Sequence, residues 1–300
     1  MTTSYRHLLV DRFDDGAIVR ITLNRPKQRN AQNRRMLEEI DDAMLAAEAD
    51  DVARVVILAG AGSMFSSGHD LGSREQLADM EAGPEQLESY RTRGAGRTGA
   101  ESWMLQEWHY FFTNTLRWRN PRKITVAQVH GPVLAGGLML MWACDLIVAA
   151  EDTEFCDLVG ARMGMCGVEY FGHPWEFGPR KAKELLLTGD SMTVDEAYRL
   201  GMVSKIFPVD ELAERTLAFA RRIAATPTVA ALLIKEAVNQ TVDNMGFYNS
   251  LQASFTLHQL NHSHWAQVHD DGFPAARSED GVPEPASAPP IRPAQRSEAG

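Results

Sequence analysis

Hydrophobic and polar positions follow short alternating patterns at the start of the chain and longer patterns after it. Residues 17–23 alternate apolar with polar side chains, after an Asp-Gly pair at 15–16 that is typical of a tight turn. Residues 33–48 carry apolar side chains at helical spacing, and residues 54–60 form the continuous apolar run of a strand covered on both faces. These patterns predict a hairpin followed by a strand–helix–strand crossover.

The pattern continues in the same order through the middle of the chain. Residues 124–131 and 145–150 indicate two more buried strands, with a glycine turn and a buried helix between them. Residues 103–118 indicate an aromatic-rich helix, whereas the polar, glycine-containing stretch 72–100 suggests a surface excursion and a candidate lid. The βαβαβ order predicts an α/β protein with a central sheet and helices outside it.

The last third of the chain changes to helical patterns. Residues 210–225, 228–244 and 247–266 predict three successive helices, and a tail from about residue 271 is rich in Pro, Ala and Ser. We therefore expect a core over residues 1–200, a helical region over 201–270 and an irregular tail over 271–300.

Composition and charge narrow the classes of function. The chain has 300 residues, 44% of them hydrophobic, and a formal net charge of −10, which argues against nucleic acid as a partner. No apolar run reaches membrane-spanning length and the start lacks a signal-peptide pattern, so we expect no membrane partner and a cytoplasmic location. The 3 cysteines form no C-x-x-C motif, which argues against a disulfide framework and a structural zinc site.

Two segments join a buried strand to a glycine turn that leads toward a helix, at residues 58–71 and 129–140. Such turns leave backbone N–H groups unpaired at a helix start, where the helix dipole favours negative charge. Two turns aimed at one point would form an oxyanion hole. Either turn alone is weak evidence, because glycines also serve purely steric roles.

Together with ITLNRPKQRNAQ near the N-terminus and LLLTGDSMTVDEAYRLGMVSKIFP after residue 184, these segments resemble the ordered signature of the crotonase, or enoyl-CoA hydratase/isomerase, superfamily. The resemblance implies a crotonase-like spiral of βαβ units with a C-terminal helical trimerisation region. It also implies an acyl-CoA substrate, no separate cofactor because CoA arrives with the substrate, and a homotrimer or a dimer of trimers. By position, the oxyanion-hole donors fall on His69 and Gly136, and the CoA-contacting residues fall on Gln28, Arg29, Asn30, Ala31, His69, Asp70, Leu71 and Gly72.

The chain departs from the resembled pattern at its two hydratase glutamates. The first position is Met139, and the second falls within residues 158–160, where no carboxylate stands. Asp157, Glu169 and Tyr170 lie close enough in sequence to act instead. Asp157 and Glu169 also have plainer interpretations, as a turn cap and a solvated loop carboxylate, and His69 can be a mere spacer.

Histidines offer two further candidates. His69 stands where a small residue is usual, so its side chain is a candidate acid–base group beside the predicted catalytic residues Gly136, Glu169 and Asp157. His258 and His262 have i, i+4 spacing, but no H-E-x-x-H motif is present and their helix falls where subunits would meet. We therefore predict no metal site.

Taken together, the sequence predicts an acyl-CoA thioester-processing enzyme of lipid metabolism, a lyase or isomerase that stabilises an enolate in a backbone oxyanion hole. The alternative is a non-catalytic acyl-CoA-binding protein that keeps the hole and lacks the acids.

Overall fold

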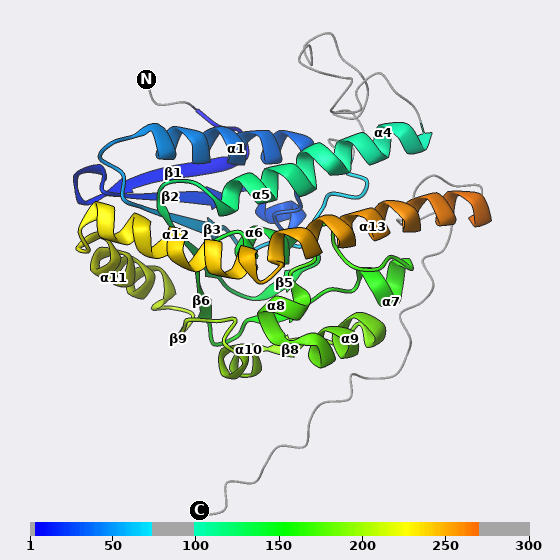
Figure 1. Ribbon diagram of the computed structural model, residues 1–300. Helices are drawn as coiled ribbons and strands as arrows, with labels where there is room; N and C mark the ends of the chain where they lie inside the picture. The colour runs from blue at the N-terminus through cyan, green and yellow to red at the C-terminus, as the bar shows by residue number, and fades with distance from the viewer. Residues whose placement is uncertain (1–3, 74–98, 270–300) are drawn as a thin grey trace, which may run out of the picture.

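A six-stranded sheet runs through the centre of the computed structural model, which describes residues 4–73 and 99–269 (Figure 1). Its strands stand in the order β1-β2-β3-β4-β6-β9, with β1 and β2 antiparallel and every later pair parallel. Their bounds are Leu8–Phe13 for β1, Ile18–Leu23 for β2, Val55–Gly60 for β3, Ile124–Val129 for β4, Leu146–Ala150 for β6 and Lys205–Phe207 for β9. The predicted hairpin and the three predicted inner strands are confirmed. The candidate lid and the predicted tail lie largely outside the described residues.

Helices cover both faces of this sheet, because its inner strands are apolar on both sides. On one face, α11 (Leu212–Ala224) contacts β2, β3, β4 and β6 and covers a buried cluster around Ile57 and Val126. On the other, α1 (Arg34–Ala49) and α6 (Gly136–Trp142) join the larger core.

A second sheet of three short strands stands where the two glycine turns approach each other. It is formed by β5 (Pro132–Leu134), β7 (Glu154–Cys156) and β8 (Met192–Thr193). Ser66, in the turn after β3, forms a parallel bridge with Val133 of β5. Since β5 leads straight into α6, this bridge holds the first glycine turn against the start of that helix.

One long helical segment crosses the top of the molecule and changes its winding in the middle. It consists of α4 (Gly99–Gln106), the π-helix η3 (Glu107–Thr113) and α5 (Asn114–Arg119). Such π-helical turns are frequent at functional sites. The predicted aromatic helix is confirmed, but its sequence pattern gave no sign of the change in winding.

The chain ends in the expected helices. They are α11, described above, α12 (Thr228–Asn244) and α13 (Phe247–His269). Four shorter helices come before them, namely α7 (Val159–Met163), α8 (His173–Phe177), α9 (Pro179–Thr188) and α10 (Val194–Leu200). Short 3-10 turns occur at Asp14–Gly16 and Pro26–Gln28. Figure 1 shows α13 running beside α4, and the two helices are in contact. Within the described residues, no single helix is long and apolar enough to cross a membrane, although the bent pair α11 and α12 meets that length and composition together.

Candidate active site

A cavity of about 110 Å³ lies where the two glycine turns, the π-helix and α13 meet. Its polar wall is formed by side chains from four separate segments, namely His69, Asp70, Glu107, Glu169, His258 and His262. The rest of the wall is mostly apolar, with Phe111, Leu158, Val159 and Met163 among its members. An enclosed apolar space with a few convergent polar groups is the usual form of a small-molecule site.

Gly136 presents an unpaired backbone N–H at this site because it is the first residue of α6. The preceding residue, Ala135, has φ 45° and ψ −116°, a strained conformation for a residue with a side chain. A Cβ atom on Gly68 would lie 2.8 Å from the nitrogen of Gly136, so the two glycine turns touch at this point. Both glycines are therefore required for the close approach.

The backbone N–H of His69 is free for the same purpose. His69 forms an isolated parallel bridge with Gln32, but the two bonds of that bridge run from Gln32 N to Gly68 O and from Asp70 N to Gln32 O. Within residues 4–73 and 99–269, neither the N–H of His69 nor that of Gly136 donates a hydrogen bond. Two unpaired donors therefore stand on the two turns, while their use as an oxyanion hole stays a prediction.

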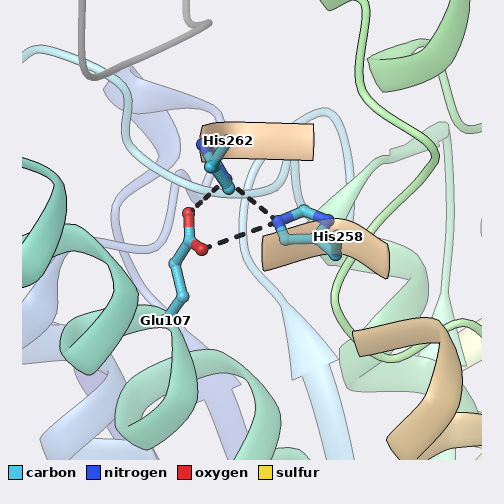
Figure 2. Close-up of side chains that lie close together, drawn as sticks. All are labelled: Glu107, His258 and His262. Atoms are coloured by element: carbon cyan, nitrogen blue, oxygen red, sulfur yellow. Dashed lines mark hydrogen bonds and ion pairs between the residues drawn. The ribbon is translucent and has the colours of Figure 1, made fainter. Parts of the chain in front are cut away.

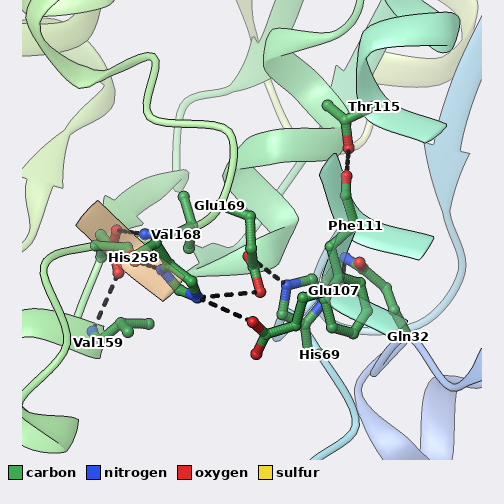
Figure 3. Close-up of polar contacts among 12 residues, drawn as sticks. Gln32, His69, Glu107, Phe111, Thr115, Val159, Val168, Glu169 and His258 are labelled. Atoms are coloured by element: carbon green, nitrogen blue, oxygen red, sulfur yellow. Dashed lines mark hydrogen bonds and ion pairs between the residues drawn. The ribbon is translucent and has the colours of Figure 1, made fainter. Parts of the chain in front are cut away.

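The side chain of His69 is held between an aromatic ring and a glycine. Its ring stacks on Phe111 with centroids 3.7 Å apart, and a Cβ atom on Gly136 would lie 2.6 Å from its Cε1 atom. Its Nε2 atom lies 3.1 Å from Oε2 of Glu169 (Figure 3). Its Nδ1 atom is buried and has no hydrogen-bond partner within the described part of the chain. One nitrogen of His69 is thus fixed while the other is unused.

Glu169 is buried beside two histidines. Burial raises the pKa of its carboxyl group, but the charge and hydrogen bond of His69 and the charge of His258 outweigh that effect and lower the pKa. Its second oxygen, Oε1, lies 3.7 Å from Nε2 of His258 (Figure 3). Glu169 is therefore held as a carboxylate that accepts the hydrogen of His69 Nε2.

Asp157 and Tyr170, the other two predicted substitutes for the missing glutamates, do not line the cavity. Asp157 accepts hydrogen bonds from the backbone N–H groups of Val159 and Val168 and lies 2.9 Å from Nε2 of His173. Tyr170 is buried in the core, where its ring contacts Phe247, and burial raises the pKa of its hydroxyl group far above the ordinary value. The contacts of Asp157 fit its plainer interpretation as a turn cap, and Tyr170 packs in the core away from the cavity.

The two segments predicted to contact CoA are tied together. Nη1 of Arg25 lies 2.9 Å from Oδ2 of Asp70 in a buried ion pair, and it also donates to the carbonyl of Ala31. Asn30 is buried, and its amide donates to the turn that follows β3. Gln28, Arg29, Leu71 and Gly72 are exposed around this ion pair. The contacts show that the predicted loops adjoin each other, while their binding of CoA stays a prediction.

The two sequence positions at which the expected glutamates are absent lie in different surroundings, one in the core and one in the cavity wall. Met139 is buried in the main core on α6 and does not line the cavity. Leu158 and Val159, at the second position, do line it. This part of the cavity wall is therefore apolar at a place where the resembled pattern has a carboxylate.

Three buried residues in the cavity wall beside Glu169 were not predicted to take part in its chemistry. Glu107 was not singled out at all, and His258 and His262 were assigned to a face where subunits would meet. Oε1 of Glu107 lies 2.7 Å from Nε2 of His262 (Figure 2). Burial raises the pKa of the Glu107 carboxyl group, but its hydrogen bonds to the two histidines outweigh that effect and lower the pKa to about 2. A signal for Glu107 does exist in the sequence, because it lies at i+4 from Trp103 and at i−4 from Phe111 on one otherwise aromatic face.

Comparison with known proteins shows the family to which this chain belongs. The model of the enoyl-CoA hydratase/isomerase family matches residues 14–92 and 98–272. The chain belongs to the enoyl-CoA hydratase/isomerase family. A protein of Mycobacterium tuberculosis named as a putative enoyl-CoA hydratase is 61% identical to it over 290 residues, which cover 97% of this chain and 91% of the relative.

Further members of the family have similar chains and similar folds. A crotonyl-CoA hydratase of Syntrophomonas wolfei is 31% identical over 79% of this chain and 83% of its own. The crystal structure of a probable enoyl-CoA hydratase from Mycobacterium smegmatis superimposes with a TM-score of 0.78 at 40% identity, over 90% of this chain and 99% of the other. The prediction of an α/β crotonase fold is confirmed, and the protein is an enzyme of the hydratase/isomerase superfamily.

Proposed function

We propose that the protein processes an acyl-CoA thioester through an enolate-like state, with the thioester oxygen bound by the backbone N–H groups of His69 and Gly136. Removing a proton next to a thioester, or adding water to a conjugated double bond, builds negative charge on that oxygen. A preorganised N–H donor stabilises such charge by roughly 3 kcal/mol. The approach of the two glycine turns, with both N–H groups unpaired, supports this role.

The observation that carries the proposal is the His69–Glu169 pair, 3.1 Å apart in the wall of the cavity. Glu169 fixes the hydrogen of the imidazole on Nε2, which leaves Nδ1 as the nitrogen that can exchange a proton. A carboxylate that orients a histidine in this way also stabilises the imidazolium that forms. We infer that His69 exchanges the proton and that Glu169 positions it, in place of the two glutamates.

The experiment is a turnover screen of the purified protein against enoyl-, malonyl- and β-hydroxyacyl-CoA thioesters, with products identified by mass spectrometry. We expect turnover of at least one class. Hydration of crotonyl-CoA should be slower than in a two-glutamate hydratase by at least about 10²-fold, because Met139 can neither hold a water molecule by a charge-assisted bond nor exchange a proton. A full hydratase rate would contradict the proposed site.

The Glu169→Gln variant tests the pair itself. An amide cannot stabilise an imidazolium, so we expect kcat on the best substrate to fall by at least about 10²-fold while CoA binding is retained. Glu151→Gln is the matched control, because Glu151 is exposed and lies away from the cavity. Unchanged turnover in Glu169→Gln would remove Glu169 from the chemistry. Tight CoA binding without turnover of any thioester would instead favour a non-catalytic acyl-CoA-binding protein, consistent with the apolar Leu158 and Val159.

A further inference from the structure

Glu107, His258 and His262 form a compact buried cluster in the wall of the cavity (Figure 2). Their exposed fractions are 2%, 4% and 6%, and one ligand atom from each lies within 4.8 Å of the others. The two histidines stand one helical turn apart on α13, whereas Glu107 begins the π-helical turn of the neighbouring segment. The cluster thus depends on the packing of two helices and has no single sequence motif.

Hydrogen bonds around the cluster fix the direction of its lone pairs. Nδ1 of His258 lies 2.9 Å from the carbonyl oxygen of Gly167, and since a carbonyl can only accept, this nitrogen carries the hydrogen. Nε2 of His258 points toward the other two residues, and it can bind an ion there once the ring has lost the proton on this nitrogen. Nε2 of Gln259 donates to Oε2 of Glu107 at 2.7 Å and holds that carboxylate in place. Partners of this kind are typical around the ligands of a metal ion.

Two of the three separations are of hydrogen-bond length, and the three together are also compatible with ligands around one ion. Nε2 of His258 lies 3.1 Å from Nε2 of His262 and 3.7 Å from Oε2 of Glu107, and Nε2 of His262 lies 2.7 Å from Oε1 of Glu107. The 3.7 Å contact is too long for a hydrogen bond. Ligands at about 2.0–2.1 Å from a tetrahedral ion stand about 3.3 Å apart, which lies inside the observed range.

We propose that Glu107, His258 and His262 bind a divalent transition-metal ion of the Zn²⁺ class. Two imidazoles and one carboxylate, with a remaining position open to a cavity, form the donor set of an accessible zinc site. All three residues line the cavity that also contains His69 and Glu169. The open position therefore faces any ligand in that cavity, and Oε1 of Glu169, 3.7 Å from His258, adds a second negative charge nearby. This inference does not depend on the proposed thioester chemistry.

The test begins with the full chain, prepared without a histidine tag and without chelators. We expect elemental analysis to find one equivalent of metal per chain. After removal of metal by a chelator, titration with Co²⁺ should give the visible absorption of a tetrahedral nitrogen–oxygen site. No bound metal and no such absorption in the wild-type protein would overturn the proposal, whether or not any thioester is turned over.

Variants connect the metal to these residues. Glu107→Gln keeps the shape of the side chain and removes the charge, and His262→Gln removes one imidazole. Because loss of even an outer partner costs 10–100-fold in affinity, we expect both to bind Co²⁺ at least about 100-fold more weakly. His264→Gln is the matched control, since His264 is exposed on the same helix and should leave the affinity unchanged.

A second measurement separates weak binding from poor folding. Added Zn²⁺ should raise the melting temperature of the wild-type and His264→Gln proteins, because a ligand that binds only the folded state stabilises it. It should leave Glu107→Gln unchanged at the same concentration. Wild-type affinity in both Glu107→Gln and His262→Gln would overturn the assignment of the ligands, even if the protein does bind metal.

Discussion

Gly136 contributes to the site through its backbone N–H and through its contact with the side chain of His69. Its N–H is unpaired, and its Cα atom stands against the ring of His69. The unpaired N–H at the start of a helix was already suggested by the sequence pattern of strand, turn and helix. The contact with His69, however, depends on the rotamer of a side chain 67 positions away, and that could not be read from the sequence.

The Gly136→Ala variant should lower kcat/KM by about 10²-fold. The new methyl group would lie 2.6 Å from Cε1 of His69, so the ring must move away from Glu169, and a displacement of about 1 Å in a catalytic group can cost this much. Steady-state kinetics with the best substrate from the screen would measure it. In a His69→Ala background the same substitution should have little further effect, because the displaced ring is then absent. Fully additive losses would contradict this account.

Glu176 leads to a second prediction at the scale of a single residue, about the pH dependence of stability. Burial raises the pKa of its carboxyl group to about 8. Between its ordinary pKa, about 4.3, and about 8, the folded state binds more protons than the unfolded state, so stability falls as the pH rises through this range. Melting temperatures from pH 6 to pH 8 should therefore fall more steeply in the wild-type protein than in Glu176→Gln. Identical slopes would contradict the raised pKa.

Elements built from continuous apolar runs were predictable, whereas those whose role depends on a neighbour were not. The strands β3 and β4 were recognised because they are buried on both faces and need no partner to explain their pattern. The π-helical turn left no mark on the sequence pattern, and the carboxylate of Glu107 meets partners far away in the sequence, on α13. His258 and His262 continue the buried stripe of Leu251 and Phe255 at helical spacing, so their burial was readable, as was the position of Glu107 on a buried face, but the pairing of Glu107 with the two histidines was not.

The segment around α7 offers a prediction at the scale of an element. Asp157 accepts hydrogen bonds from the first residue of this short helix, from Val168 after its end and from His173 on α8. Asp157→Asn removes the charge and exchanges an acceptor for a donor. We expect a loss of about 1–3 kcal/mol in the free energy of unfolding, measured by chemical denaturation. Turnover per folded molecule should stay within about twofold of the wild-type value. A large loss of turnover at unchanged stability would show that Asp157 takes part in catalysis.

At the scale of the whole molecule, residues 4–73 and 99–269 leave an apolar surface on α12 exposed. This helix has no buried residue, and its apolar side chains include the exposed Val229, Leu233, Ile234 and Val238. Exposed apolar patches of this kind mark surfaces of association. The predicted homotrimer or dimer of trimers would give this surface a partner.

Light scattering coupled to size exclusion should therefore report three or six chains of 33.3 kDa per particle. Leu233→Glu should shift the distribution toward smaller particles, because a charge in an apolar interface loses its water without gaining a partner. Leu187→Glu is the matched control, since Leu187 is also exposed but belongs to α9. A monomer in the wild-type protein at micromolar concentration would contradict the predicted assembly.

The change of winding at Glu107–Thr113 makes the site sensitive to chain length as well as to side chains. A π-helical turn contains one residue more than an α-helical turn, so deleting a single residue there would allow the whole segment to adopt ordinary α-helical geometry with α4 and α5 still in place. The side chains inside the turn would then be redistributed over one residue fewer. Glu107, which meets His262, and Phe111, which stacks on His69, both belong to this turn. A one-residue gap at this place in a related sequence would therefore mark a protein in which these contacts are rearranged, even where all the residue types are still present.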